Sequence, residues 1–191
     1  MRRLRFLLPA FATTCVLAVA PAAATANPAP TATSAAMARA CPGANLAPTV
    51  VHAAQVRRAT LCLLNRQRVR HGLRRLRLHR SLGNAATRYA RLMVAKHFFN
   101  HVSPGGSTMT QRIERTRYLR HTRAWSLGEN LAWGAGSSAT PARIVNAWMH
   151  SAGHRANILD DSYREIGIGI ALGSPVGGSG ATYVNEFGRR A

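Results

Sequence analysis

The sequence predicts an α+β domain in which helices cover a small antiparallel sheet. Between residues 52 and 96, apolar side chains recur at intervals of three and four, which is the periodicity of helices with one buried face. In the last third the period changes to two, because isoleucines and a leucine alternate with Gly and Ala in IGIGIAL, residues 166–172. Such alternation indicates a strand. The turn-rich GSPVGGSG separates it from a second strand, ATYVNEF, and helices followed by strands favour the α+β class.

Four helices are expected ahead of these strands. The first runs from His52 to His71-Gly72, and the second begins at Ser81 as N-cap and buries the stripe Leu82, Ala86, Tyr89 and Met93. The third begins with a capping box of Thr108 and Gln111. The fourth runs from Thr140-Pro141 to Gly153. The segment SLGENLAWG, residues 126–134, is expected to hold a short strand or an irregular stretch. Both glycines of GIGI lie on one face of their strand, so a helix or a Trp must approach that face closely.

The first 26 residues have the features of a secretory signal peptide. Three arginines precede an apolar run that ends in small residues, and the expected cut follows Ala26. Residues 27–50 are rich in Pro, Ala and Thr and are expected to form a leader, which leaves residues 51–191 for the folded domain. No stretch after the signal peptide is apolar enough to span a bilayer. We therefore expect a protein that is secreted and is either extracellular or associated with the cell envelope.

Cysteine usage fits an oxidising compartment. Cys15 lies inside the predicted signal peptide, which leaves Cys41 and Cys62. Two cysteines in a secreted domain usually pair. The disulfide would stabilise the fold by roughly 3 kcal/mol in the chain-entropy model and would pin the N-terminal segment to the first helix.

The chain is strongly basic. It has 26 Lys and Arg against 6 Asp and Glu, a formal charge of +20 that falls to about +17 without the signal peptide. Arginines are concentrated in RQRVRHGLRRLRLHR, residues 66–80. Such a surface attracts anionic polymers and lipid headgroups. Because the cluster has no interleaved aromatic residues and no nucleic-acid-binding motif, it favours a solvated face or loose attachment to an anionic cell-envelope polymer over nucleic-acid binding.

Three glycine-bounded segments carry the candidate site residues. FFNHVSPGG contributes His101, GENLAWG contributes Glu129 and HSAGHRANIL contributes His154. If these segments converge, two imidazoles and a carboxylate could hold a divalent metal such as zinc, or act without metal as general acid and base. The structural alternative is that each is a surface or capping residue. His150, on the last turn of its helix, is expected to interact with the helix dipole and to take no part in the site.

Familiar catalytic signatures are absent. The sequence has no HExxH, no G-x-S-x-G, no paired CxxC and no glycine-rich phosphate loop. The residue pattern by itself therefore leaves open whether the protein is an enzyme.

Six segments, taken in order, resemble the bacterial branch of the CAP superfamily, which groups cysteine-rich secretory, antigen-five and pathogenesis-related proteins. They are LNRQRVRHGLRRL, FFNHVSP, GENLAWG, AWMHSAGHRANIL, EIGIGIA and YVNEFG, and together they span about residues 60–188. The resemblance implies an α-β-α sandwich with a three-stranded antiparallel sheet. It also implies that His101, Glu129 and His154 meet around a central cleft, which in some members binds zinc or another divalent ion.

The chain departs from this family pattern at the second cleft acid. Many members have an acid on the helix before the second histidine, whereas Ser151 or His150 stands there in this chain. The loss of an acid should weaken divalent binding. Glu186 on the last strand would compensate only if its side chain points inward, so Ser151 and Glu186 are accessory candidates.

Other residues of the HRANIL segment also match the family. Asn157 is expected to hydrogen-bond to neighbouring backbone while Ile158 and Leu159 enter the core. Arg155 is expected to pair with a carboxylate such as Glu165 or to face an anionic ligand.

Three interpretations follow for function. The first is a secreted binding module whose cleft takes a divalent ion or a small or lipid ligand, with arginines holding it near an anionic envelope. The second is a secreted hydrolase or peptidase in which His101, Glu129 and His154 activate water. The third makes the histidines a hydrogen-bonded network that only holds the loops together. CAP folds serve different ends, so the resemblance does not decide among them.

Overall fold

The computed structural model describes residues 41–191. The predicted signal peptide and residues 27–40 of the predicted leader lie outside the described residues, and both stay predictions. Within residues 41–191, none of the helices combines the length and the apolar character needed to cross a membrane.

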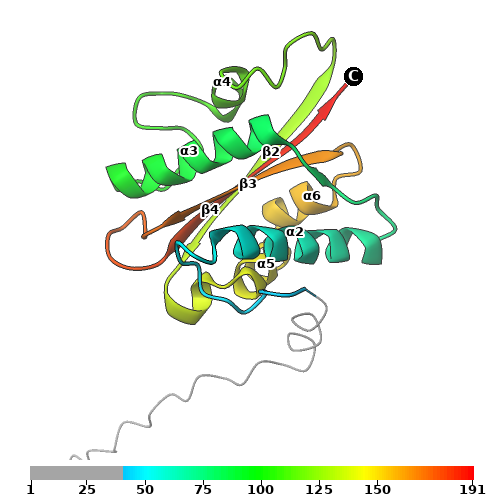
Figure 1. The fold of residues 1–191 in the computed structure, drawn as a ribbon. Helices are drawn as coiled ribbons and strands as arrows, with labels where there is room; N and C mark the ends of the chain where they lie inside the picture. The colour runs from blue at the N-terminus through cyan, green and yellow to red at the C-terminus, as the bar shows by residue number, and fades with distance from the viewer. Residues whose placement is uncertain (1–40) are drawn as a thin grey trace, which may run out of the picture.

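A four-stranded sheet forms the centre of the fold (Figure 1). Its strands are β1 (Arg77–Leu78), β2 (Trp125–Gly134), β3 (Glu165–Leu172) and β4 (Ala181–Arg190), in the spatial order β1-β3-β4-β2. β1 pairs in parallel with β3, and the other pairs are antiparallel. The prediction of three strands was wrong by one, because β1 has only two residues and is too short to leave an alternating pattern in the sequence.

Helices cover both faces of this sheet. They are α2 (Ala53–Arg70), α3 (Arg80–Lys96), α4 (Met109–Glu114), α5 (Pro141–Met149) and α6 (Ala152–Leu159), and a short 3₁₀ turn, η1 (Gly136–Ala139), precedes α5. Helices α3 and α4 lie on one face, and α2, α5 and α6 lie on the other (Figure 1). The predicted α-β-α sandwich is therefore confirmed.

Helix α3 lies directly on two glycines of β3. A Cβ atom at Gly167 would come within 2.0 Å of the carbonyl carbon of Leu82, and one at Gly169 within 2.2 Å of that of Ala86. Any larger residue at either position would push the helix off the sheet. The expectation of a close approach is confirmed, and the approaching element is a helix, not a Trp.

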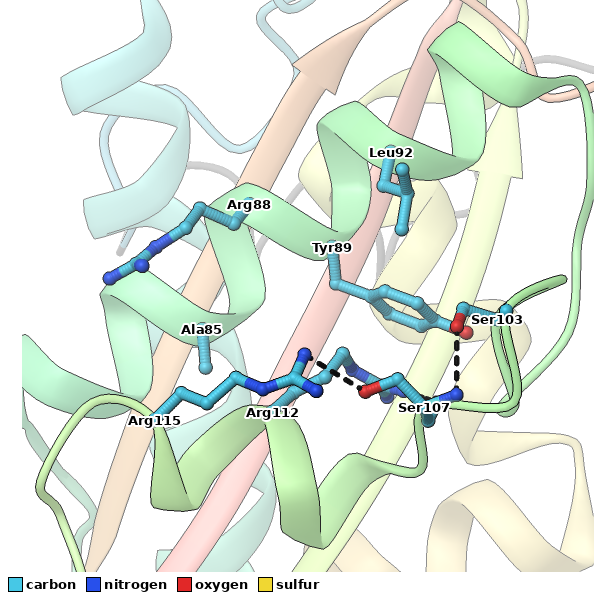
Figure 2. Close-up of a pocket in the computed structure, with 9 residues that line it drawn as sticks. Ala85, Arg88, Tyr89, Leu92, Ser103, Ser107, Arg112 and Arg115 are labelled. Atoms are coloured by element: carbon cyan, nitrogen blue, oxygen red, sulfur yellow. Dashed lines mark hydrogen bonds between the residues drawn. The ribbon is translucent and has the colours of Figure 1, made fainter.

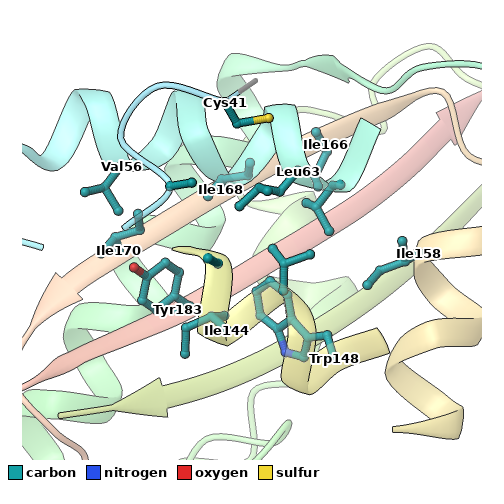
Figure 3. Packing of buried hydrophobic residues seen from close by; sticks show 14 of the residues in the cluster. Cys41, Val56, Leu63, Ile144, Trp148, Ile158, Ile166, Ile168, Ile170 and Tyr183 are labelled. Carbon is teal, nitrogen blue, oxygen red and sulfur yellow. The ribbon is translucent and has the colours of Figure 1, made fainter. Parts of the chain in front are cut away.

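The main hydrophobic core lies on the opposite face, between the sheet and helices α2, α5 and α6 (Figure 3). Trp148 of α5 is buried there, and its indole N–H donates to the carbonyl oxygen of Leu131 at 3.0 Å. Tyr183 packs edge-on against Trp148, and its hydroxyl donates to the carbonyl oxygen of Ala139 at 2.7 Å. Both polar tips are satisfied inside the core, as burial of aromatic residues with a polar group requires.

Arg68, near the C-terminus of α2, is also fully buried on this face of the sheet and links separate parts of the chain. Its guanidinium donates to four backbone carbonyl oxygens, those of Arg74, Ile158, Asp160 and Tyr163. Arg68 thereby joins α2 to the segment that follows α6.

Cys41 and Cys62 form the predicted disulfide, with Cα atoms 5.7 Å apart. The bridge joins the first described residue to helix α2 across 21 residues of sequence. It holds the end of the predicted leader against the main core, to which Cys41 belongs.

The N-terminus of α3 differs from the prediction. The helix begins at Arg80 with His79 as N-cap, and Ser81 lies in its first turn. Nδ1 of His79 accepts a hydrogen bond from the backbone N–H of Ser81 at 3.2 Å. The ring nitrogen thus takes the part that a serine hydroxyl usually plays at this position.

The predicted fourth helix is two helices. α5 ends at Met149, and Ser151 has an extended backbone with φ −106° and ψ 121° before α6 begins at Ala152. His154 therefore lies on a helix of its own, almost one turn beyond the break. The other uncertain segment, SLGENLAWG, is regular strand throughout, because β4 pairs with it along its whole length.

Candidate functional site

The candidate site lies at strand β2, which is an edge of the sheet formed by residues 41–191 because, among them, only β4 pairs with it. His101 comes from the loop between α3 and α4, Glu129 from β2 and His154 from α6. Elements from both faces of the sheet therefore reach this edge.

His101 and Glu129 are in direct contact. Nδ1 of the imidazole lies 2.7 Å from Oε1 of the carboxylate. The side chain of His101 is 57% exposed, whereas that of Glu129 is 3% exposed. A carboxylate that accepts the Nδ1 proton fixes both the tautomer and the orientation of the ring, and leaves Nε2 to meet a ligand.

Arg112 of α4 occupies the other oxygen of Glu129 and was not among the residues predicted for the site. Its Nη2 lies 2.5 Å from Oε2, and its Nη1 donates to the carbonyl oxygens of His101 and Ser107. A buried carboxylate needs such a partner. The need for a cationic partner was the only feature of the sequence that pointed to Arg112, and it does not indicate which of the 26 Lys and Arg residues pairs with Glu129.

Tyr89 of α3 covers the face of the Arg112 guanidinium. The guanidinium carbon lies 3.3 Å from the centre of the ring, a cation–π contact. The Tyr89 hydroxyl donates to the carbonyl oxygen of Asn100 at 2.5 Å, next to His101. Burial raises the pKa of Tyr89 to about 12, so the hydroxyl keeps its proton at neutral pH. A residue predicted only as core stripe therefore also positions the loop that carries His101.

Glu186 points inward beside Glu129. The two residues are register partners in the β2–β4 pair, and Glu186 is fully buried, with no hydrogen-bond partner for its carboxyl oxygens among residues 41–191. Burial raises the pKa of Glu186 well above its usual value, and the negative charge of Glu129 raises it further. When protonated, Glu186 can donate a hydrogen bond to Glu129.

His154 lies close enough to His101 for the two rings to interact electrostatically. Burial lowers the pKa of His154, and positive charge on His101 lowers it further. Nδ1 of His154 lies 2.8 Å from Oγ of Ser151, the residue at the break between α5 and α6. His154 is therefore a neutral, half-buried imidazole with a hydroxyl partner.

Two asparagines hold α6 against β2. Asn130 donates to the carbonyl oxygen of His154 at 3.0 Å. Asn157 donates to the carbonyl oxygen of Glu129 at 3.1 Å and to the side chain of Asn130 at 2.9 Å. Asn157 was expected to bond to neighbouring backbone, but its partners lie on the strand, and these bonds set the distance between the helix and Glu129.

Two residues of the same segment stay outside the site. His150 is the exposed C-cap of α5, and its Nδ1 lies 2.8 Å from the carbonyl oxygen of Asn146. Arg155 is exposed and does not pair with Glu165, because Tyr118 donates to that carboxylate at 2.7 Å and Arg190 lies 3.4 Å from it.

Comparison with known proteins identifies the family. The model of the cysteine-rich secretory protein family, CAP, matches residues 61–185, which is more than half of the chain. The chain belongs to the CAP family. The matched range contains all of β2, α5, α6 and β3, and the first half of β4, so it includes every residue of the candidate site except Glu186.

Curated relatives of this CAP domain occur in Bacillus subtilis. The chain is 32% identical to the uncharacterized protein YkwD over 125 residues, which are 65% of this chain and 44% of that protein. It is 31% identical to the uncharacterized membrane protein YlbC over 110 residues, 58% of this chain and 30% of that protein. The chain thus spans less than half the length of either relative.

Solved structures share the fold. An outer surface protein from Borrelia burgdorferi has a TM-score of 0.55 at 23% identity, covering 67% of this chain and 87% of that one. An extracellular protein containing an SCP domain from Bacillus anthracis has a TM-score of 0.55 at 24% identity, covering 73% of this chain and 44% of that one. At these identities the likeness establishes the fold alone.

The donor set of this CAP domain fits a divalent ion poorly. Within residues 41–191, no group of three or more His, Cys, Asp or Glu side chains is placed to hold a metal. Both oxygens of Glu129 already have partners, Arg112 and His101, and a guanidinium repels a cation. A metal bound by His101, Glu129 and His154 would require Arg112 to leave the carboxylate.

Proposed function

We propose that this protein is an extracellular CAP-domain binding module that takes a small ligand at the edge of the sheet, between His101 and His154. The observation that carries the proposal is the 2.7 Å contact between His101 and Glu129, which fixes an exposed imidazole on a buried carboxylate. Residues held in this way are preorganised for a ligand, because little side-chain freedom is lost on binding.

The two rings offer complementary hydrogen-bonding groups. Neither Nε2 has a hydrogen-bond partner among the described residues, and Glu129 and Ser151 hold the two Nδ1 atoms. Because the pKa of His154 is lowered by burial, its Nε2 is available as a neutral acceptor or donor at neutral pH. A ligand with a hydroxyl, amide or carboxylate group suits this pair.

Secretion and attachment to an anionic envelope belong to the same proposal. The predicted signal peptide and the formal charge of about +17 without it support the proposal, as does the similarity of the fold to an outer surface protein of Borrelia burgdorferi and an extracellular protein of Bacillus anthracis. Binding of a divalent ion such as zinc stays a prediction, and the ion would have to compete with Arg112 for the carboxylate of Glu129. A lipid stays an alternative ligand.

The test is a titration of the purified chain without its signal peptide. Calorimetry with zinc chloride and binding to phosphatidylglycerol vesicles probe the two ligand classes, using wild type, the double variant His101→Gln with His154→Gln, and His150→Gln as matched control. The proposal expects saturable binding of one probe below about 1 mM that the double variant loses at least about ten-fold and the control keeps. Silence with both probes, or equal binding by all three proteins, would contradict it.

A second candidate function is hydrolysis, favoured by the contact between Ser151 and His154. Nδ1 of the neutral imidazole, 2.8 Å from Oγ, could take the hydroxyl proton as the oxygen attacks a carbonyl carbon. A fluorophosphonate probe tests this, because it labels activated serines. Labelling that disappears in Ser151→Ala but persists in Ser162→Ala would support hydrolysis, and an unlabelled wild type would exclude Ser151 as a nucleophile.

A further inference from the structure

A cavity next to the His101–His154 site, sharing Tyr89 and Arg112 with it, lies between α3, α4 and the loop of residues 103–107 (Figure 2). Its volume is about 390 Å³. One wall is apolar and consists of Ala85, the ring of Tyr89 and Leu92, all on α3. Neither histidine of the proposed site lines it, so its occupant need not be the ligand proposed above.

The cavity carries positive charge from Arg88 on α3 and from Arg112 and Arg115 at α4, and it carries no acid, because none of the lining residues is Asp or Glu. Arg112 is neutralised by Glu129, but neither Arg88 nor Arg115 forms an ion pair with a carboxylate among the described residues. Two exposed guanidinium groups without a carboxylate partner make the cavity attractive to an anion.

Two serines on the loop of residues 103–107 add hydroxyl donors to the cavity. Ser103 Oγ accepts from the backbone N–H of Ser107 at 3.0 Å, and Ser107 Oγ accepts from Nη1 of Arg115 at 3.3 Å (Figure 2). Each hydroxyl therefore keeps its own proton for a further bond. The backbone N–H of Ser103 donates to the carbonyl oxygen of Ser107, which closes the turn and fixes both side chains before any ligand arrives.

We infer that this cavity binds a phosphate-type oxyanion carried on a small apolar group. Guanidinium and hydroxyl donors with no carboxylate among them recognise an acceptor-only, negatively charged group, and phosphate oxygens match the guanidinium fork. The apolar wall would contact the substituent. A volume of 390 Å³ lies near the lower end of the range of about 300–1,000 Å³ for ligand sites, so the substituent must be small.

The experiment compares two double variants of equal net charge. Arg88→Gln with Arg115→Gln removes both uncompensated guanidinium groups of the cavity, whereas Arg91→Gln with Arg120→Gln removes two exposed arginines that do not line it. Calorimetry with inorganic phosphate and with phenyl phosphate measures affinity, and amide chemical shifts of Ser103 and Ser107 locate the binding. Melting temperatures verify that every variant is folded.

The inference expects wild type to bind phenyl phosphate and the cavity variant to lose at least about ten-fold in affinity, while the control pair loses less than about two-fold. Leu92→Gln should weaken phenyl phosphate and leave inorganic phosphate unchanged, because only the former reaches the apolar wall. A further comparison distinguishes a soluble phosphate ester from a lipid headgroup. Phenyl phosphate should bind more tightly than dihexanoyl phosphatidic acid, because the acyl chains of the lipid are too large for the cavity.

Three outcomes would overturn the inference. They are no binding of either phosphate at millimolar concentration, equal losses in the two double variants, and amide shifts that leave Ser103 and Ser107 unmoved. Equal losses would show that net charge alone attracts anions. None of the three bears on His101 and His154, so the proposed function stands or falls separately.

Discussion

Two buried arginines on opposite faces of the sheet do different work. Arg68 is fully buried and binds four carbonyl oxygens and no carboxylate. Arg112 binds two carbonyl oxygens and Glu129, its Nε has no hydrogen-bond partner in the described chain, and it lies next to the exposed ring of His101. The first is satisfied and enclosed, as a structural group should be. The second is incompletely satisfied and close to solvent, which is typical of a group that also serves a site.

The contrast extends to the regions around them. Around Arg68, buried polar side chains have backbone partners that the fold itself supplies. On the α3–α4 side, next to Glu129, the carboxyl oxygens of Glu186 are buried without a hydrogen-bond partner among residues 41–191, and burial raises the pKa of Glu186. Unsatisfied buried groups reduce stability, so the buried carboxyl of Glu186 costs the fold stability next to Glu129.

The largest expected effect is the loss of the Arg68 guanidinium. Arg68→Ala removes one donor group from four carbonyl oxygens and leaves the buried carbonyl of Ile158 without that donor, and we expect it to lower the free energy of unfolding by about 4 kcal/mol. Urea denaturation followed by circular dichroism measures the loss. Arg58→Ala, on the same helix but with a side chain that is not buried, is the control and should change stability by less than about 0.5 kcal/mol. Similar losses in both would mean that Arg68 is not an anchor.

Arg112→Gln should have the second largest effect, a loss of about 2–3 kcal/mol. It leaves the buried Glu129 carboxylate with His101 but without its guanidinium partner, whereas the loop carbonyls of His101 and Ser107 that it releases lie beside exposed residues and can bind water. The same denaturation measurement applies, with Arg120→Gln as control. A loss that equals or exceeds that of Arg68→Ala would erase the proposed difference between the two arginines.

Glu186→Gln should raise stability at neutral pH. A group whose pKa is raised on folding binds more protons in the folded than in the unfolded state, so it destabilises the fold as pH rises above its ordinary value of 4.5. We therefore expect Glu186→Gln to have a higher free energy of unfolding than wild type at pH 7, measured by urea denaturation. The gain should vanish near pH 4. Exposed Glu114→Gln should give no such pH-dependent gain.

The smallest expected effect is the pH dependence due to His154. Its pKa is lowered on folding by burial, so it contributes to stability above the ordinary value of 6.5, and that contribution is lost as pH falls below it. Half-exposure makes the slope shallow. In His154→Gln, the decline of melting temperature between pH 7 and pH 5 should be less steep than in wild type, while His150→Gln should follow wild type. A steeper decline in His154→Gln would contradict a lowered pKa.

Much of the fold could be predicted from sequence patterns. The helical stripe of α3, the capping box of Thr108 and Gln111, the glycines of β3 and the pairing of Cys41 with Cys62 all leave local signals, because each depends on the identity of residues at fixed spacings. The missing pieces were a two-residue strand, the break at Ser151 and the histidine N-cap of α3. These elements are stabilised by contacts with distant parts of the chain and leave little local pattern.

The sequence alone determined that a basic chain would fold as helices on a small sheet, and it identified three segments with site-like chemistry. Only the tertiary structure decided that His101 contacts Glu129, that His154 turns toward Ser151, and that Arg112 takes the remaining carboxylate oxygen. The physical reason is that secondary structure follows periodic local preferences, whereas the partner of a buried charge is set by which side chains the packed sheet and helices bring within bonding distance.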